Sequence, residues 1–164
     1  MTKNILRISH TLLFLLLVAG CARNSPDAQT AVSPASNLTT ADVAKLRWIE
    51  GTWRGSGVDQ PPFFERYRLE NNTTLLVDSF PDEKLDKVED TSRFELKDGK
   101  FGSSNYLASS IDESSVNFEP IAGKAKNSFR WERVSDNSWK ATLKWTADGQ
   151  AKERVYNMER IPGK

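Results

Sequence analysis

The sequence predicts an all-β domain, an antiparallel up-and-down β-barrel of about 8–10 strands with a short N-terminal helix. From Phe63 onward, apolar and polar residues alternate with a period of two, which is typical of strands that bury one face. Two pairs, Asp98-Gly99 and Asp148-Gly149, separate such segments and favour tight hairpin turns. Closing this meander into a barrel would remove its exposed edges.

A short helix is expected before the strands. Thr39 and Asp42 have the spacing of a capping box, in which side-chain oxygens accept hydrogen bonds from free backbone N–H groups. Apolar residues then recur at helical spacing from Val43 to Ile49, and Gly51 suits the end of the helix. We therefore expect a helix of about two to three turns.

The strands follow in order. Phe63 to Leu69 alternates with polar neighbours, and the stretch from Thr73 to Phe80 follows an Asn-Asn turn. The segment from Trp139 to Trp145 alternates with lysines and threonines and is the clearest amphipathic strand. The last strand is expected from Lys152 to Ile161, which makes about nine strands from Thr52 onward.

The segment from Pro81 to Asp90 carries seven charged residues in ten. Such a composition is typical of a solvated loop or a strand at the barrel rim. A lid over the barrel mouth is the alternative.

Residues 1–20 have the three-part pattern of a secretory signal peptide. Lys3 and Arg7 supply the positive region, and an apolar run from Leu12 to Val18 follows. This run is shorter than the ~20 apolar residues of a membrane-spanning helix.

The segment from Val18 to Cys21 resembles the bacterial lipobox, whose cysteine is lipidated and becomes the first mature residue. Cys21 is therefore expected to anchor the chain to a membrane, because buried acyl methylenes contribute ~0.8 kcal/mol each. An ordinary secreted protein with an incidental cysteine is the alternative. Ala22 follows the cysteine, and in this resemblance it favours the periplasmic face of the outer membrane.

The remaining boundaries follow from composition. Residues 21–40 are poor in bulky apolar side chains and are expected to form a flexible tether, with the barrel domain in residues 41–164.

Charge and residue counts exclude several function classes. The formal net charge of the chain is +1, so the chain lacks the excess of basic residues that is typical of a nucleic-acid-binding protein. The single histidine, His10, lies in the signal peptide, and the single cysteine is the lipidation residue. We therefore expect no metal site, no cofactor, no histidine-based catalytic triad and no enzymatic activity.

The segment from Leu46 to Gly57 resembles the opening of lipocalin-like and nitrobindin-like barrels, and its positions in the shared pattern are Gly51, Trp53, Gly55 and Gly57. Later segments look like a bacterial family of lipocalin-like domains, so that the resemblance covers residues 45–161; these segments are Val116–Pro120, Phe129–Arg133, Trp139–Trp145 and Tyr156–Arg160. The resemblance implies that Trp53 plugs one end of the barrel and that the glycines let the strand bend. It also implies haem bound through a late histidine in nitrobindin-like proteins, but no histidine is present there.

Two residues of the last strand are candidates for ligand binding. Arg154 and Tyr156 are similar to the Arg-x-Tyr pair with which fatty-acid-binding barrels hold a ligand carboxylate. A guanidinium and a phenol inside a cavity would bind a carboxylate through charge-assisted hydrogen bonds. The alternative is that Arg154 and Arg160 face solvent.

Glu65 and Tyr67 share the inward face of their strand, and a carboxylate there needs a partner. Arg154 is a candidate partner for Glu65 in an internal ion pair; a ligand contact and a general acid of raised pKa are the alternatives. Trp131 belongs to a group of late aromatic residues that either line a cavity or fill it.

These observations favour a membrane-anchored barrel that binds a small hydrophobic or amphipathic ligand, with a fatty acid or another carboxylate as one candidate. The alternative is an envelope lipoprotein with a filled barrel that acts through surface contacts with a protein partner.

Overall fold

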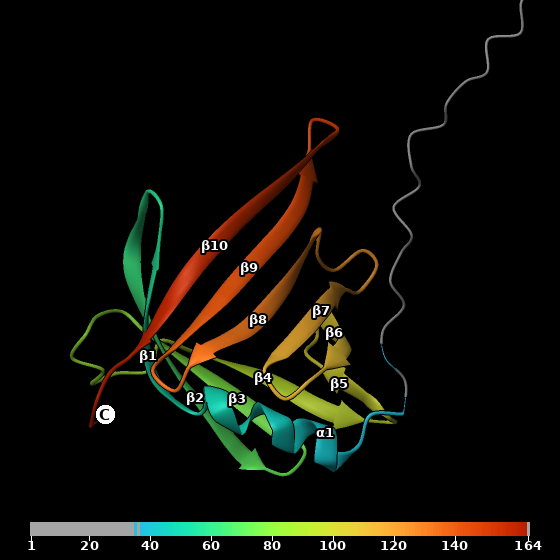
Figure 1. The fold of residues 1–164 in the computed structure, drawn as a ribbon, viewed down its shortest axis with the longest axis horizontal. Helices are drawn as coiled ribbons and strands as arrows, with labels where there is room; N and C mark the ends of the chain where they lie inside the picture. The colour runs from blue at the N-terminus through green and yellow to red at the C-terminus, as the bar shows by residue number, and fades with distance from the viewer. Residues whose placement is uncertain (1–34, 36, 164) are drawn as a thin grey trace, which may run out of the picture. The chain divides into compact units, whose positions relative to one another are not determined.

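The computed structural model describes residue 35 and residues 37–163. These residues form a closed, all-antiparallel barrel of ten strands preceded by a short helix (Figure 1), which confirms the predicted fold class. Each strand pairs with the next along the chain, and β1 pairs with β10 to close the barrel. The strands are β1 (Gly51–Gly57), β2 (Gln60–Asn71), β3 (Thr74–Phe80), β4 (Asp90–Lys97), β5 (Lys100–Gly102), β6 (Tyr106–Ile111), β7 (Ser115–Pro120), β8 (Asn127–Ser135), β9 (Ser138–Ala147) and β10 (Gln150–Arg160).

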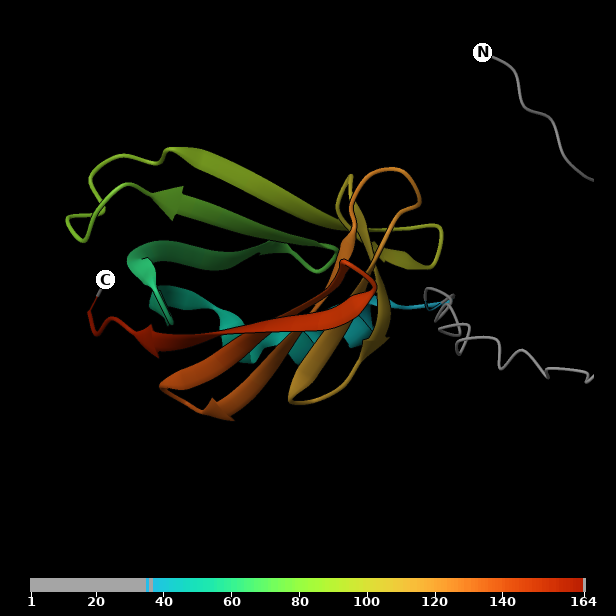
Figure 2. The same cartoon turned by 90° about the horizontal axis from the view of Figure 1, so that it is seen from above.

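The two ends of the barrel differ. Helix α1 (Thr40–Ala44) and the 3₁₀ helix that follows it (Lys45–Ile49) lie at the end where β8 turns into β9, which we call the closed end (Figure 1). The β1–β2 and β9–β10 hairpins extend at the opposite end, which we call the open end. Figure 2 shows the same barrel turned by 90°.

The helix is fixed by the predicted capping box. The Asp42 carboxylate accepts hydrogen bonds of 2.9 Å from both the backbone N–H and the hydroxyl of Thr39. Its hydrogen bond with Lys45, followed by those with Thr39, lowers the pKa of Asp42 to about 2. The apolar face of this helical segment consists of Val43, Leu46 and Ile49, and all three side chains are fully buried, as their spacing predicted.

Trp53 seals the closed end, as the resemblance implied. Its side chain is 1% exposed, and its indole N–H donates a 2.7 Å hydrogen bond to the carbonyl of Ile49. The guanidinium of Arg160 stands 4.1 Å from the centre of the Trp53 ring system. Arg160 also donates hydrogen bonds to the carbonyls of Trp48 and Glu50. The last strand, the helical segment and the first strand are thereby joined at one point.

Contacts with the barrel begin before residue 41. The backbone N–H of Ala35 donates to the carbonyl of Ala108, and that of Leu38 donates to the carbonyl of Gly99, both at 2.9 Å. Leu38 also packs against the main core. The predicted signal peptide, Cys21 and the first part of the predicted tether lie outside the described residues.

The charged segment after β3 is a loop, and one apolar residue ties it to the outer wall. Leu85 is buried against Phe64 of β2 and Phe80 of β3. Both rings belong to the set of alternate residues that faces away from the barrel interior, opposite to Glu65 and Tyr67. Leu85 is therefore held on the outer wall instead of over the open end.

None of the helices in the described residues is both long and apolar enough to cross a membrane.

Candidate functional site

The barrel interior contains a cavity of about 250 Å³. Its wall is mainly aromatic, with rings from five strands: Phe63, Tyr67, Phe94, Phe129, Trp131, Trp139 and Tyr156. The predicted alternatives, a lined or a filled barrel, are both realised in part. Toward β5 and β7, Phe101 and Phe118 are fully buried and fill the interior, whereas space remains between β2 and the late strands.

Two glycines of β1 make room for the rings at one side of the cavity. A Cβ atom on Gly55 would lie 2.1 Å from the ring of Phe63, and one on Gly57 would lie 2.8 Å from the ring of Tyr156. These two rings meet edge to face, with their centres 5.4 Å apart. The register between β1 and β2 also shifts between the two glycines, in agreement with the bend that the resemblance implied.

Glu65 places a carboxyl group in this aromatic wall. It lies between Phe63 and Tyr67 on the inward face of β2, as the period of two predicted. The Tyr67 hydroxyl donates a hydrogen bond of 2.6 Å to Oε2 of Glu65. Burial raises the pKa of Glu65, although the Tyr67 hydrogen bond opposes this shift. Burial also raises the pKa of Tyr67 well above its usual value, so the phenol stays protonated and remains the donor.

Four of the five residues predicted to bind ligand line the cavity, namely Glu65, Tyr67, Trp131 and Tyr156. Arg154 does not, because it is exposed on β10 at the open end. Its guanidinium still reaches the Tyr156 hydroxyl, to which it donates a long hydrogen bond of 3.4 Å. The Arg-x-Tyr pair is therefore formed at the rim of the cavity.

The expected ion pair between Glu65 and Arg154 is not formed. Among the ion pairs of the described residues, none includes either side chain. Glu65 takes its hydrogen bond from Tyr67 instead, two residues further along the same face of the strand. Arg160, the other arginine on that face of β10, is engaged over Trp53 at the closed end.

Trp139 is one of the late aromatic residues that the sequence predicted would line or fill the barrel, but the state of its indole N–H was not predicted. It lines the cavity and is 1% exposed, and its indole Nε1 has no hydrogen-bond partner among the described residues. The indole N–H of Trp139 is therefore a buried donor without a partner in the described part of the chain. The alternation in β9 places Trp139 inward, but whether its N–H finds a partner depends on packing in three dimensions.

A second hollow, of about 450 Å³, adjoins the cavity between β4 and β6. It shares Ser92, Phe94 and Phe129 with the cavity wall, and polar side chains of β4 and the β5–β6 turn form the rest. β5 and β6 are joined in register at a single pair, Gly102 and Leu107, so the wall is least tightly paired here.

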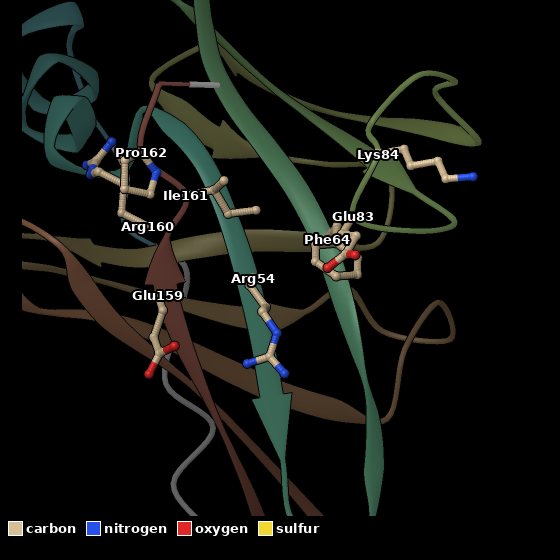
Figure 3. Close-up of a pocket in the computed structure, with 8 residues that line it drawn as sticks. All are labelled: Arg54, Phe64, Glu83, Lys84, Glu159, Arg160, Ile161 and Pro162. Carbon is tan, nitrogen blue, oxygen red and sulfur yellow. The ribbon is translucent and has the colours of Figure 1, made fainter.

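The outer wall carries a separate groove of about 450 Å³ (Figure 3). Arg54 and Glu159, from the paired strands β1 and β10, lie on it together with Phe64 and Ile161. Charges of both signs line this groove, and none of the predicted ligand-binding residues belongs to it. No group of three or more metal-ligating side chains is arranged to hold an ion within the described part of the chain.

No model of a known protein family matches the sequence, and no curated protein matches it. Among solved structures, a mutant of the fluorescent protein UnaG is 12% identical, with a TM-score of 0.44, over 73% of this chain and 98% of its own. The barrel EF1p2_mFAP2b, bound to DFHBI, is 12% identical, with a TM-score of 0.39, over 75% of this chain and 100% of its own. A redesigned β-barrel is 13% identical, with a TM-score of 0.32, over 77% of this chain and 99% of its own.

Replacement of Glu65 with glutamine is expected to stabilise the protein increasingly as the pH rises. Burial raises the pKa of Glu65 above its unfolded value, so the native state holds this proton more tightly than the unfolded chain does. The stability that Glu65 contributes is therefore present at low pH and is lost as the pH rises through the raised pKa. Glutamine does not titrate, and its amide oxygen still accepts the Tyr67 hydrogen bond.

The measurement is urea denaturation of the Glu65→Gln and unmodified proteins at about pH 4 and about pH 8. The difference in unfolding free energy between them should be larger at the higher pH. Glu89→Gln, at an exposed position of the loop after β3, serves as the control and should show a smaller change. Equal pH dependence in all three proteins would mean that Glu65 is not held in a desolvated site.

Proposed function

We propose that this chain is a lipid-anchored binding protein whose barrel holds a small, largely apolar ligand, and that it carries out no chemical reaction on it. The observation that carries this proposal is the aromatic cavity of about 250 Å³ with the Glu65–Tyr67 pair in its wall. Ligand sites are typically apolar and concave, with a few polar groups that orient the ligand.

The size of the cavity bounds the ligand. Pockets that enclose drug-sized molecules usually measure roughly 300–1,000 Å³, and this cavity is smaller. A ligand of one ring or a short chain fits this volume best. A longer, fatty-acid-like ligand would have to extend past the rim, where Arg154 and Tyr156 lie together.

Titration with a neutral aromatic probe, 2-phenylethanol, tests the proposal. The five tryptophan indole N–H signals in a ¹⁵N NMR spectrum report where the probe binds. Trp131 and Trp139 line the cavity, so their signals should shift saturably, whereas the signal of Trp145, which does not line it, should not. Absence of any saturable shift would reject ligand binding and favour the alternative, an envelope protein that acts through surface contacts.

The anchor is a separate part of the proposal and rests on the lipobox resemblance of residues 18–21. Replacement of Cys21 with serine removes the thiol that would carry the lipid, so the protein should move from the membrane fraction of its bacterial host to the soluble fraction. Fractionation followed by immunoblotting measures this change. Retention of the Cys21→Ser protein in the membrane fraction would contradict lipid anchoring, and with it the proposed outer-membrane location.

A further inference from the structure

The cavity combines one acidic group with no basic group. Of the described residues that line it, Glu65 is the one carboxylic acid, and no lysine, arginine or histidine is among them. The Tyr67 hydroxyl satisfies Oε2 of Glu65, whereas Oε1 makes no hydrogen bond within the described part of the chain. An acceptor is thus left free beside the cavity space.

A carboxylate in this position is costly to the empty protein. An ionised group in apolar surroundings is destabilising unless a partner of opposite charge or several hydrogen bonds compensate. The protein supplies the Glu65 carboxylate with a single hydrogen bond. Arg154, the basic residue on the inward face of β10 at the open end, lies outside the cavity. A cationic group on the ligand would provide the missing partner.

The rings next to Glu65 suit the same type of ligand. Phe63 and Tyr67 flank Glu65 on β2, and Trp131 and Trp139 each meet the Tyr67 ring edge to face, at 5.5 and 5.4 Å between centres. The electron-rich faces of aromatic rings attract cations, with tryptophan the most effective. A carboxylate ligand placed here would instead meet the negative charge of Glu65.

We propose that the cavity binds a small protonated amine with an apolar body, and that its ammonium group pairs with the carboxylate of Glu65. This inference rests on the proposed function, because it names the ligand class of the same cavity. Charge-assisted hydrogen bonds are stronger than neutral ones, so the charge of the ligand is expected to dominate its affinity.

Three probes test the inference: 2-phenylethylamine, 2-phenylethanol and 3-phenylpropionate. Each carries a single phenyl ring, and they differ in the polar group and its charge. Each is titrated into the full chain near neutral pH and followed by the indole signals of Trp131 and Trp139. The amine should bind at least about tenfold more tightly than the alcohol, which corresponds to about 1.4 kcal/mol. The carboxylate should bind more weakly than the alcohol.

Two variants locate the effect. Glu65→Gln should lose about tenfold or more in affinity for the amine and keep its affinity for the alcohol, which also shows that it is folded. Glu119→Gln is the matched control, because Glu119 is a half-buried carboxyl in a hollow of the outer wall and does not line the cavity. Its affinity for the amine should be unchanged.

The outcomes separate this inference from the proposed function. If the alcohol binds and the amine binds no better, the ligand class is wrong and the proposed function stands. If the carboxylate binds best and loses affinity in Arg154→Ala, the rim pair of Arg154 and Tyr156 recognises the ligand and the amine inference is overturned. If none of the three probes binds, both the inference and the proposed function fail.

Discussion

Replacement of Trp53 with alanine is expected to lower the free energy of unfolding by about 3–5 kcal/mol, the range for removal of a large buried aromatic side chain. Trp53 is 1% exposed and packs edge to face on Trp139, with ring centres 6.0 Å apart. Its loss would also deprive the Ile49 carbonyl of its indole donor and the Arg160 guanidinium of the ring below it. The damage therefore extends beyond the cavity that the missing ring leaves behind.

Urea denaturation followed by circular dichroism measures this loss without relying on tryptophan fluorescence. Trp145→Ala is the matched control. Trp145 is half-buried near the open end, where the guanidinium of Arg154 stands 5.9 Å from its ring. Its removal should cost less than about 1.5 kcal/mol. A similar loss of unfolding free energy in the two variants would show that the contacts of Trp53 at the closed end contribute no more than those of a half-buried tryptophan.

Replacement of Ala141 with leucine is expected to reduce the affinity for a cavity ligand by at least about tenfold. Ala141 lies on β9, is 8% exposed and lines the cavity. A leucine side chain would occupy space that the ligand needs, while Glu65 and Tyr67 keep their hydrogen bond. Because unfilled apolar space destabilises a core, the variant should unfold at a temperature no lower than that of the unmodified protein.

The adjacent residue provides the control. Thr142 lines a hollow of the outer wall on the same strand, so Thr142→Leu adds bulk without entering the cavity. Its affinity for the probe should be unchanged. If Ala141→Leu folds and still binds the probe as the unmodified protein does, the ligand site is not this cavity.

The period of two in the sequence predicted much of the site. It places Phe63, Glu65 and Tyr67 on one face of β2, and the structure puts all three on the cavity wall. The same rule places Tyr156 and Met158 on one face of β10, and the structure puts both of them on the cavity wall. Side-chain direction in a strand depends only on position along it, so this part of the site can be read locally.

Other features depend on how strands are staggered and packed, which the alternation does not encode. Arg154 is on the inward face of β10 by position, yet it lies at the rim because the long β9–β10 hairpin extends toward the open end. The partner of Glu65 was expected among basic residues, but it is the neutral phenol of Tyr67. The volume left inside a barrel depends on the number and stagger of its strands and on how the rings pack. The presence of an empty cavity could therefore be established only from the three-dimensional structure.

The glycines of β1 are an intermediate case. Their spacing led to the expectation of a bend, and the register between β1 and β2 does shift between Gly55 and Gly57. Their second role, to leave room for the rings of Phe63 and Tyr156, involves residues from two other strands. Pairing across the barrel is needed to recognise it.

Ligand binding by the barrel is tested by native mass spectrometry of the protein purified from its own host without added ligand, and again after addition of 2-phenylethylamine. We expect a noncovalent adduct of small mass that is retained under gentle conditions and is reduced in Ala141→Leu. A covalent lipid on Cys21 would remain after denaturation and is therefore distinguished from this adduct. A folded protein that carries no adduct and takes up no amine would contradict the claim that this barrel is a ligand-binding protein.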